Sequence, residues 1–151
     1  MRTYLVVIDD SDEARVALRF AARRAIKTGG AVEILALVPP QEFVAWGGVQ
    51  AAMEEEARLR AEAMVVAAAG ALFEESGIEP SITVRRGEPV AVVKAMLTER
   101  PETAALVLGA SASAGPGPLV SYFAGSAAGT MPCPVMIVPG SLSDEALDLL
   151  S

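Results

Sequence analysis

The sequence predicts an α/β fold: one doubly wound, parallel sheet of five strands in the order 3-2-1-4-5, with helices on both faces. Short, continuous apolar runs such as residues 4–8 are typical of strands buried on both faces. These runs alternate with longer segments in which apolar residues recur at helical spacing. The 151 residues suit about one domain, and 52% hydrophobic residues can cover a sheet and leave apolar surface for an oligomer. We expect a domain over residues 1–140 and a tail, 141–151, of one helical turn or two.

The first predicted strand, residues 4–8, leads directly into a helix. Asp10 or Ser11 can cap the start of this helix, and acidic residues in its first turn suit the helix dipole. Small apolar residues mark one face at helical spacing: Ala14, Ala17, Leu18, Ala21 and Ala25. Gly29-Gly30 ends the helix. Because this face is made of small residues, we expect the helix to lie close to the sheet.

The second predicted strand, residues 32–38, is followed by an irregular excursion over residues 41–49 and then by a long helix over residues 50–76. The predicted core-facing residues of this helix are Met53, Ala57, Ala61, Met64, Ala68 and Leu72. Within the excursion, we interpret Trp46 as a loop or interface residue rather than as a ligand-stacking one.

The second half of the chain is predicted to add three strands, with a helix between the third and the fourth strand. Residues 81–84 alternate like an edge strand with one face open to water. Pro89 suits the first position of a helix that continues over residues 90–100. Residues 104–108 and 135–138 are the fourth and fifth strands.

Composition excludes several classes of function. A net charge of −7 argues against a nucleic-acid partner and against an anionic membrane surface. With no histidine and the single cysteine Cys133, the chain can form neither an internal disulfide nor an ordinary zinc site. Residues 4–8 are too short for a signal-peptide core, and the longest apolar run, 63–73, is too short to span a membrane. We expect a soluble, cytoplasmic protein and an inert Cys133 thiol.

The candidate site lies where the first and fourth strands end. In a doubly wound sheet, ligands bind at this edge, at the point where the strand order reverses. Asp9 ends the first strand and Gly109 the fourth, and the segment 110–121 is rich in residues with small side chains. Gly125-Ser126 is predicted to begin a helix whose free N–H groups favour an anion such as phosphate. The sequence therefore predicts an anion-binding crevice.

Three motifs follow one another along the chain: Asp9-x-Ser11, Gly87-x-Pro89, and Gly125-Ser126 followed by the segment PCPVMIVP at 132–139. Together they resemble the universal stress protein family over nearly the whole chain. The resemblance implies the sheet described above and homodimers that form through the last strand, Val135 to Val138. In its nucleotide-binding branch, the family holds ATP with a signature of glycine, two residues, glycine, nine residues, then glycine and Ser or Thr.

Carried over by this resemblance, Asp9 would contact the ribose or the adenine edge, Val38 would flank the adenine, and Gly109, Gly115, Gly125 and Ser126 would contact the phosphates. Only the second half of the signature is kept, because Ala112 stands where the first glycine would precede Gly115. The loop is then about three residues longer than the family pattern. Alternatively, Ala112 occupies the second glycine position and the insertion follows it.

The phosphate-facing stretch also departs from the family in its charge. Arg100 is the last basic residue of the chain, so no cation follows it. Backbone dipoles at a helix end contribute only about 0.3–1 kcal/mol for an exposed charge. A triphosphate would therefore need Mg²⁺, or Arg85 or Arg86 reaching across. We expect weaker ATP binding than in members with the full motif, or a preference for a nucleotide with fewer phosphates.

Three hypotheses about function remain open from the sequence. The first is a homodimeric stress-response or signalling protein that binds ATP or AMP, with at most slow hydrolysis because no strong general base or arginine finger is evident. The second is an interaction module of the same fold whose loop contacts a protein partner or a different small anion instead of a nucleotide. The third is an enzyme with Asp9 as its base. The apolar last strand would be an exposed edge unless a second copy covers it, which favours a dimer.

Overall fold

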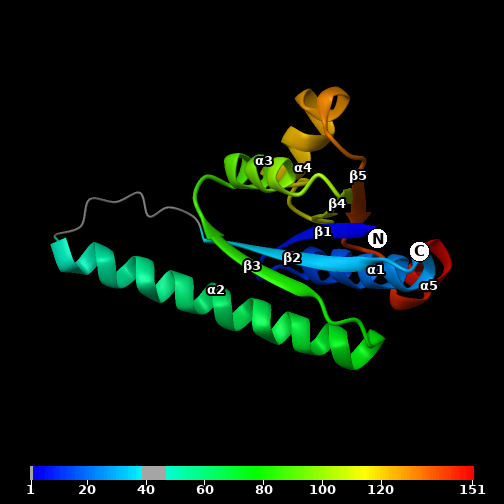
Figure 1. Cartoon of the computed structure of the whole chain (residues 1–151), viewed down its shortest axis with the longest axis horizontal. Helices are drawn as coiled ribbons and strands as arrows, with labels where there is room; N and C mark the ends of the chain where they lie inside the picture. Colours follow the sequence, from blue (N-terminus) through cyan, green and yellow to red (C-terminus); the bar gives the residue numbers. More distant parts are fainter. Residues whose placement is uncertain (1, 39–46) are drawn as a thin grey trace.

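In the computed structural model, which describes residues 2–38 and 47–151, the five predicted strands form one sheet (Figure 1). The strands are β1 (Thr3–Ile8), β2 (Ala31–Val38), β3 (Ser81–Arg86), β4 (Thr103–Ala110) and β5 (Val135–Pro139). Their order is β3-β2-β1-β4-β5, and each neighbouring pair is parallel. The predicted fold class is confirmed.

Helices cover both faces of the sheet (Figure 1). They are α1 (Asp12–Thr28), α2 (Gly47–Ser76), α3 (Pro89–Glu99), α4 (Pro118–Ser121) and α5 (Asp144–Leu150), with a π-helical turn at Tyr122–Ser126 and a 3-10 turn at Ala128–Thr130. Helices α1, α2 and α5 pack on one face, and α3 and the π-helical turn pack on the other. The molecule thus has three layers and two separate apolar cores.

The central strand β1 supplies both cores because successive side chains of a strand point to opposite faces. Tyr4, Val6 and Ile8 lie in the core under α1 and α2, whereas Leu5 and Val7 lie in the core under α3. All five side chains are buried. A continuous apolar run is therefore what a strand in this position requires.

Helix α1 begins and ends at the predicted residues. The Ser11 hydroxyl accepts a hydrogen bond from the Ala14 N–H at 3.2 Å. Gly29, with φ of 66°, takes the left-handed conformation that ends many helices. The predicted inner face is buried throughout: Ala14, Ala17, Leu18, Ala21 and Ala25. Because these side chains are small, the helix axis can lie close to β1 and β4.

Helix α2 differs from its prediction at its start. It begins at Gly47, so residues 47–49, predicted to be irregular, are helical. The predicted stripe does face the sheet: Ala61 and Leu72 are buried, and Met53, Ala57, Met64 and Ala68 are half-buried. The predictions for Trp46 and for the excursion over 41–46 lie outside the described residues.

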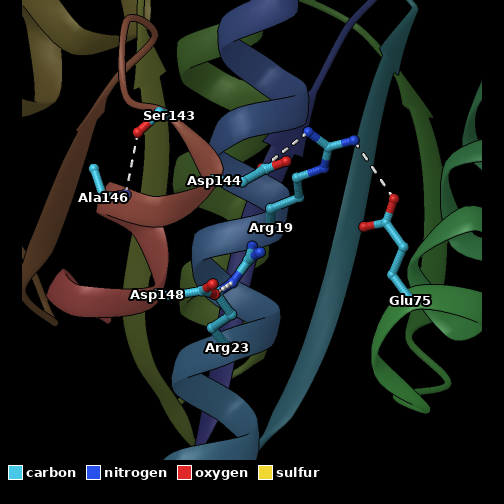
Figure 2. Close-up of polar contacts among 7 residues, drawn as sticks. All are labelled: Arg19, Arg23, Glu75, Ser143, Asp144, Ala146 and Asp148. Atoms are coloured by element: carbon cyan, nitrogen blue, oxygen red, sulfur yellow. Dashed lines mark hydrogen bonds and ion pairs between the residues drawn. The ribbon is translucent and has the colours of Figure 1, made fainter.

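The tail forms a helix, α5, that packs on α1. The Ser143 hydroxyl caps it by accepting a hydrogen bond from the Ala146 N–H at 3.2 Å (Figure 2). One turn later, Leu147 is fully buried in the core shared with α1. The apolar anchor and the cap explain why so short a helix is ordered, because isolated helices of this length are marginal in water.

Charged side chains join α5 to its neighbours (Figure 2). Arg19 of α1 lies 3.4 Å from Asp144 of α5 and 3.5 Å from Glu75 of α2, so it links three helices. One turn along α1, Arg23 donates to Asp148 at 2.5 Å. Exposed ion pairs each add little to the free energy of folding, so the burial of Leu147 contributes most to the docking of α5 on α1.

We expect Leu147→Ala to lower the free energy of unfolding by about 2 kcal/mol or more, because it removes a fully buried side chain and leaves a cavity. The matched control is Leu149→Ala in the same helix, where the side chain is 86% exposed and the change stays within about 0.5 kcal/mol. Urea unfolding monitored by circular dichroism measures both. Equal effects of the two substitutions would contradict the docking of α5.

Candidate functional site

A crevice of about 300 Å³ lies at the carboxyl ends of β1 and β4. Asp9, Ser11 and Glu13 line one side of it, and Gly109 lines it together with residues 116–120. Side chains from β2 and from the start of α3 complete the wall. This is the point where the strand order reverses, as the sequence predicts for the site.

Asp9 is held in place by the residues that begin α1. Its Oδ1 atom accepts hydrogen bonds from the Ser11 N–H, at 2.9 Å, and from the Ser11 hydroxyl. The Ser11 hydroxyl in turn accepts from the Ala14 N–H. Among the hydrogen bonds of the described residues, none involves Oδ2 of Asp9. Asp9 thus combines a structural role with one carboxylate oxygen available to a ligand.

Gly109 is required by packing within the chain. A Cβ atom at this position would lie 2.2 Å from the carbonyl oxygen of Glu13 and 3.2 Å from the Ala14 nitrogen. The first turn of α1 therefore lies directly against the end of β4. This contact accounts for the glycine without any ligand, whereas the sequence suggested a close approach to phosphate.

The loop after β4 is organised by Ser111. Its hydroxyl accepts from the Ser113 and Ala114 N–H groups, each at 3.3 Å. Gly115 and Gly117 follow with φ of 79° and 95°, in the left-handed region that favours glycine. Gly117 lines the crevice, and Gly115 is exposed and does not.

The predicted helical turn at Tyr122–Ser126 is present, but Gly125-Ser126 does not begin a regular helix. Helical residues begin earlier, at Pro118, and Gly125, with non-helical angles (φ −101°, ψ −110°), forms a kink before the short 3-10 turn at Ala128–Thr130. Proline favours the first position of a helix, and the fully buried Phe123 anchors the segment beneath α3. Gly125-Ser126 therefore lies at a kink of the chain and does not line the crevice.

The structure brings together only part of the predicted set. Asp9 and Gly109 line the crevice, whereas Val38, Gly115, Gly125 and Ser126 do not. Ser126 lies in a separate hollow with Lys94 and Thr98. Val38 faces α2, and its neighbour Leu37 lines the crevice because adjacent strand residues point to opposite faces.

One further signal in the sequence locates the crevice better than the glycine spacing does. Pro118 suits the first turn of a helix, helical residues begin there, and the segment Pro116-Gly117-Pro118 lines the crevice. Because strand residues alternate between faces, only one of Leu37 and Val38 can face the crevice, and the structure shows that it is Leu37.

The crevice carries negative charge. Asp9 and Glu13 contribute carboxylates, and no Lys or Arg lines the crevice within the described residues. The two arginines expected to reach across are paired elsewhere: Arg85 donates to Glu99 at 2.5 Å, and Arg86 donates to a glutamate of α2 at 2.6 Å. The hydrogen bond from Arg85 holds the pKa of Glu99 below its ordinary value. A bound phosphate would thus meet no protein cation here.

Cys133 lies apart from the crevice, among residues packed on the α3 core. The thiol is half-buried, and this burial raises its pKa, although the backbone at Leu106 partly opposes the shift. A protonated thiol is a poor nucleophile, which agrees with the expectation of an inert cysteine.

The model of the Universal stress protein family matches residues 1–139. This chain belongs to the universal stress protein family. Among solved structures, it is similar to universal stress protein UspA from Lactobacillus plantarum, with 19% identity, a TM-score of 0.77, and coverage of 91% of this chain and 97% of that one. No curated protein matches the sequence significantly. Helix α5 lies beyond the matched residues.

Two more structures similar to this universal stress protein contain nucleotides. One is the protein from Archaeoglobus fulgidus in complex with dAMP, with 20% identity, a TM-score of 0.54, and coverage of 91% and 98%. The other is a family protein from Arabidopsis thaliana with AMP bound, with 18% identity, a TM-score of 0.54, and coverage of 97% and 99%. At such identities the likeness establishes the fold. No described helix combines the length and apolar character of a membrane crossing.

We expect Gly109→Ala to lower the free energy of unfolding by about 1–3 kcal/mol, because the added Cβ would overlap the Glu13 carbonyl group. Gly129→Ala is the matched control, since a Cβ there meets nothing within 4 Å. Chemical denaturation of the two variants without ligand measures the difference. A Gly109→Ala protein as stable as the control would show that β4 and α1 do not approach closely.

Proposed function

We propose that this universal stress protein binds an adenine nucleotide of low charge, AMP rather than ATP, in the crevice at the ends of β1 and β4. It then acts as a homodimeric stress-response or signalling protein whose ligand changes a surface read by a protein partner. The observation that carries the proposal is the position of the crevice at the switch point of the sheet. Nucleotides bound in two structural neighbours support it.

The groups around the crevice suit a nucleoside. Its volume of about 300 Å³ is at the lower end of the range for small-molecule sites. Leu37 and Leu108 offer apolar surface to a base. The free Oδ2 of Asp9 offers an acceptor to a ribose hydroxyl or an exocyclic amine.

The charge of the crevice favours a monophosphate. Two carboxylates line it, and Arg85 and Arg86 are engaged with glutamates. Each added negative charge near a carboxylate costs about 1 kcal/mol at 4 Å in water, and several times more where water is excluded. ATP carries more negative charge than AMP, and Mg²⁺ bound to ATP neutralises part of the difference.

We expect AMP to bind at least about tenfold more tightly than ATP without Mg²⁺, a difference of about 1.4 kcal/mol, because of this repulsion. Added Mg²⁺ should narrow the gap. Calorimetric titration with AMP, ATP and ATP–Mg²⁺ measures the three affinities. Tighter binding of metal-free ATP would contradict the charge argument. No heat and no thermal shift with any of them would favour the interaction-module alternative.

Titration with adenosine, which carries no phosphate, tests Asp9 as a hydrogen-bond acceptor apart from its repulsion of phosphate. Asp9→Asn keeps an Oδ1 acceptor for Ser11, so that the start of α1 is preserved. Loss of the charged acceptor should weaken adenosine binding about tenfold. Asp10→Asn makes the same change beside the crevice and should alter the affinity less than about twofold.

The homodimer is proposed to form through β5, which is an edge strand of the sheet. The Leu106 N–H donates to Pro134 O at 3.0 Å, so alternate residues of β5, among them Ile137, direct their backbone groups to the open edge. The side chain of Ile137 is 36% exposed. An apolar strand with unpaired backbone groups is a template for a second copy.

We expect Ile137→Lys to make the protein monomeric, because a lysine on a strand edge opposes pairing. Ile82→Lys places the same change on the opposite edge strand, β3, where Ile82 is 41% exposed, and should leave the dimer intact. Size-exclusion chromatography with light scattering gives the mass of each variant. An unchanged mass of Ile137→Lys relative to a dimeric wild type would exclude β5 as the interface.

A further inference from the structure

Helix α2 has two apolar faces, of which the fold uses one. Its inner face is buried against the sheet and α1 through Ala61, Val65, Ala69 and Leu72. Its outer face carries Leu59, Val66 and Phe73, which are 51%, 62% and 53% exposed. Figure 1 shows α2 along one edge of the molecule, with the sheet on its inner side. An ordinary surface helix has a polar outer face, so these three residues require an explanation.

The three exposed residues form one line along the helix, which we call the outer seam (Leu59, Val66 and Phe73). Each is seven residues from the next. Seven residues make almost two turns, so successive members are rotated by only about 20°. At a rise of 1.5 Å per residue, the outer seam is about 21 Å long. This spacing is typical of a helix that packs against another helix.

Gly70 lies within the outer seam, between Val66 and Phe73. A Cβ at this position would meet nothing within 4 Å, and the backbone is helical. Packing within the described chain therefore does not require a glycine here. Glycine in the middle of a helix is destabilising relative to alanine. Its use is explained if another backbone approaches the helix closely at this point.

We propose that a second copy of this chain packs its own α2 antiparallel on the outer seam. With Val66 at the two-fold axis, Leu59 lies against the partner's Phe73, since both residues are seven positions from the axis. Glu62 and the partner's Gly70 are then level along the axis, since both are four positions from it, and they lie on opposite flanks of the outer seam. The missing side chain of the glycine lets the two helices approach closely beside the seam. The surface is self-complementary, as a two-fold contact requires.

Charges beside the outer seam favour the antiparallel arrangement. Arg60 and Glu74 lie on the same side of it, about 120° and 80° around the helix from Val66. In the antiparallel pair, Arg60 is within about one turn of the partner's Glu74. Arg60 is 68% exposed and 3.5 Å from Glu56, so it can turn to a partner.

The contact is short and is distinct from the proposed β5 interface. A seam of this length buries less than the roughly 1,200 Å² of a stable interface, so the association is weak and depends on concentration. Helix α2 packs over β2 and β3, whereas β5 lies at the opposite edge of the sheet. One interface can therefore be tested while the other is blocked.

Cysteine cross-linking tests the register. In a Cys133→Ser background, Leu59→Cys and Phe73→Cys proteins with tags of different size are mixed and treated with a short bismaleimide. We expect cross-links between the two different proteins, because position 59 lies against position 73 of the other copy. Cross-links only between two copies of the same variant, from 59 to 59 or from 73 to 73, would show a parallel pair and overturn the proposal. So would the absence of any cross-link above the level seen in a Val66→Glu background.

Sedimentation equilibrium over a concentration series tests the surface in an Ile137→Lys background. This background removes pairing through β5, so the outcome is independent of the proposed β5 homodimer. We expect Val66→Glu to weaken association at least tenfold. Val49→Glu makes the same change on α2 at a residue 55% exposed and about 100° from the outer seam, and should leave association within twofold. Equal association of both variants and the parent protein would overturn the proposal.

Gly70→Ala gives an independent readout, because it should stabilise the monomer but weaken its self-association. The alanine should raise the melting temperature of the monomer, since it favours the helix. It should also weaken self-association, since a Cβ then stands in the contact. A higher melting temperature with undiminished association would exclude the close backbone approach on which the antiparallel pair depends.

Discussion

The contact between the first turn of α1 and the ends of β4 and β5 determines the shape of the whole carboxyl edge of the sheet. At Gly109, a Cβ would lie 2.2 Å from the Glu13 carbonyl oxygen, and at Gly140 it would lie 2.8 Å from the Glu13 Cβ. Gly140 also donates its N–H to Ala110 O at 2.8 Å. Two residues without side chains thus let a helix cross directly over two strand ends. This close contact positions the start of α1 against the ends of β4 and β5.

This constraint explains the size and the charge of the crevice. Because α1 begins so close to β4, its first residues stand at the crevice. Ser11 caps the helix, Asp9 accepts a hydrogen bond from the Ser11 N–H, and Glu13 of the first turn lines the crevice. Acidic residues at a helix start stabilise the helix dipole, so the carboxylates are explained by the fold itself. Their consequence for a ligand is repulsion of phosphate. The same residues that build the helix start therefore restrict the charge of what can bind beside it.

The fold could be predicted from the sequence because each signal was local. Continuous apolar strands, the Ser11 cap and Gly29 at the end of α1 all specify structure within a few residues. The site could be predicted less completely. The spacing of Gly115 and Gly125 matches a family signature, but neither glycine lines the crevice. The segment between them does, because helical residues begin at Pro118. Which of Val38 and Leu37 faces the crevice depends on strand register, which the family resemblance does not specify.

Helix α5 shows a different limit of prediction. The one or two helical turns predicted in the tail are confirmed by α5, but the placement of this helix depends on the burial of Leu147 against α1 and on Arg19 and Arg23, more than a hundred positions away in the sequence. Contacts over such separations cannot be derived from local patterns. The match to the family model also ends before α5. The docking of the tail is thus a property of this chain that only the three-dimensional structure displays.

The two cores do not bury all of the large apolar side chains of the chain. Large apolar side chains remain exposed on α2, on β5 and on α5 of the described chain, including Phe73, Ile137 and Leu149. The first two groups lie on opposite sides of the molecule, over β2–β3 and at the β5 edge. The two proposed self-complementary surfaces, each with its own two-fold axis, would link copies into closed tetramers or into open chains, according to the angle between the axes. With the α2 contact the weaker of the two, a dimer through β5 would be the dominant species at low concentration. The negative net charge opposes further growth of the assembly.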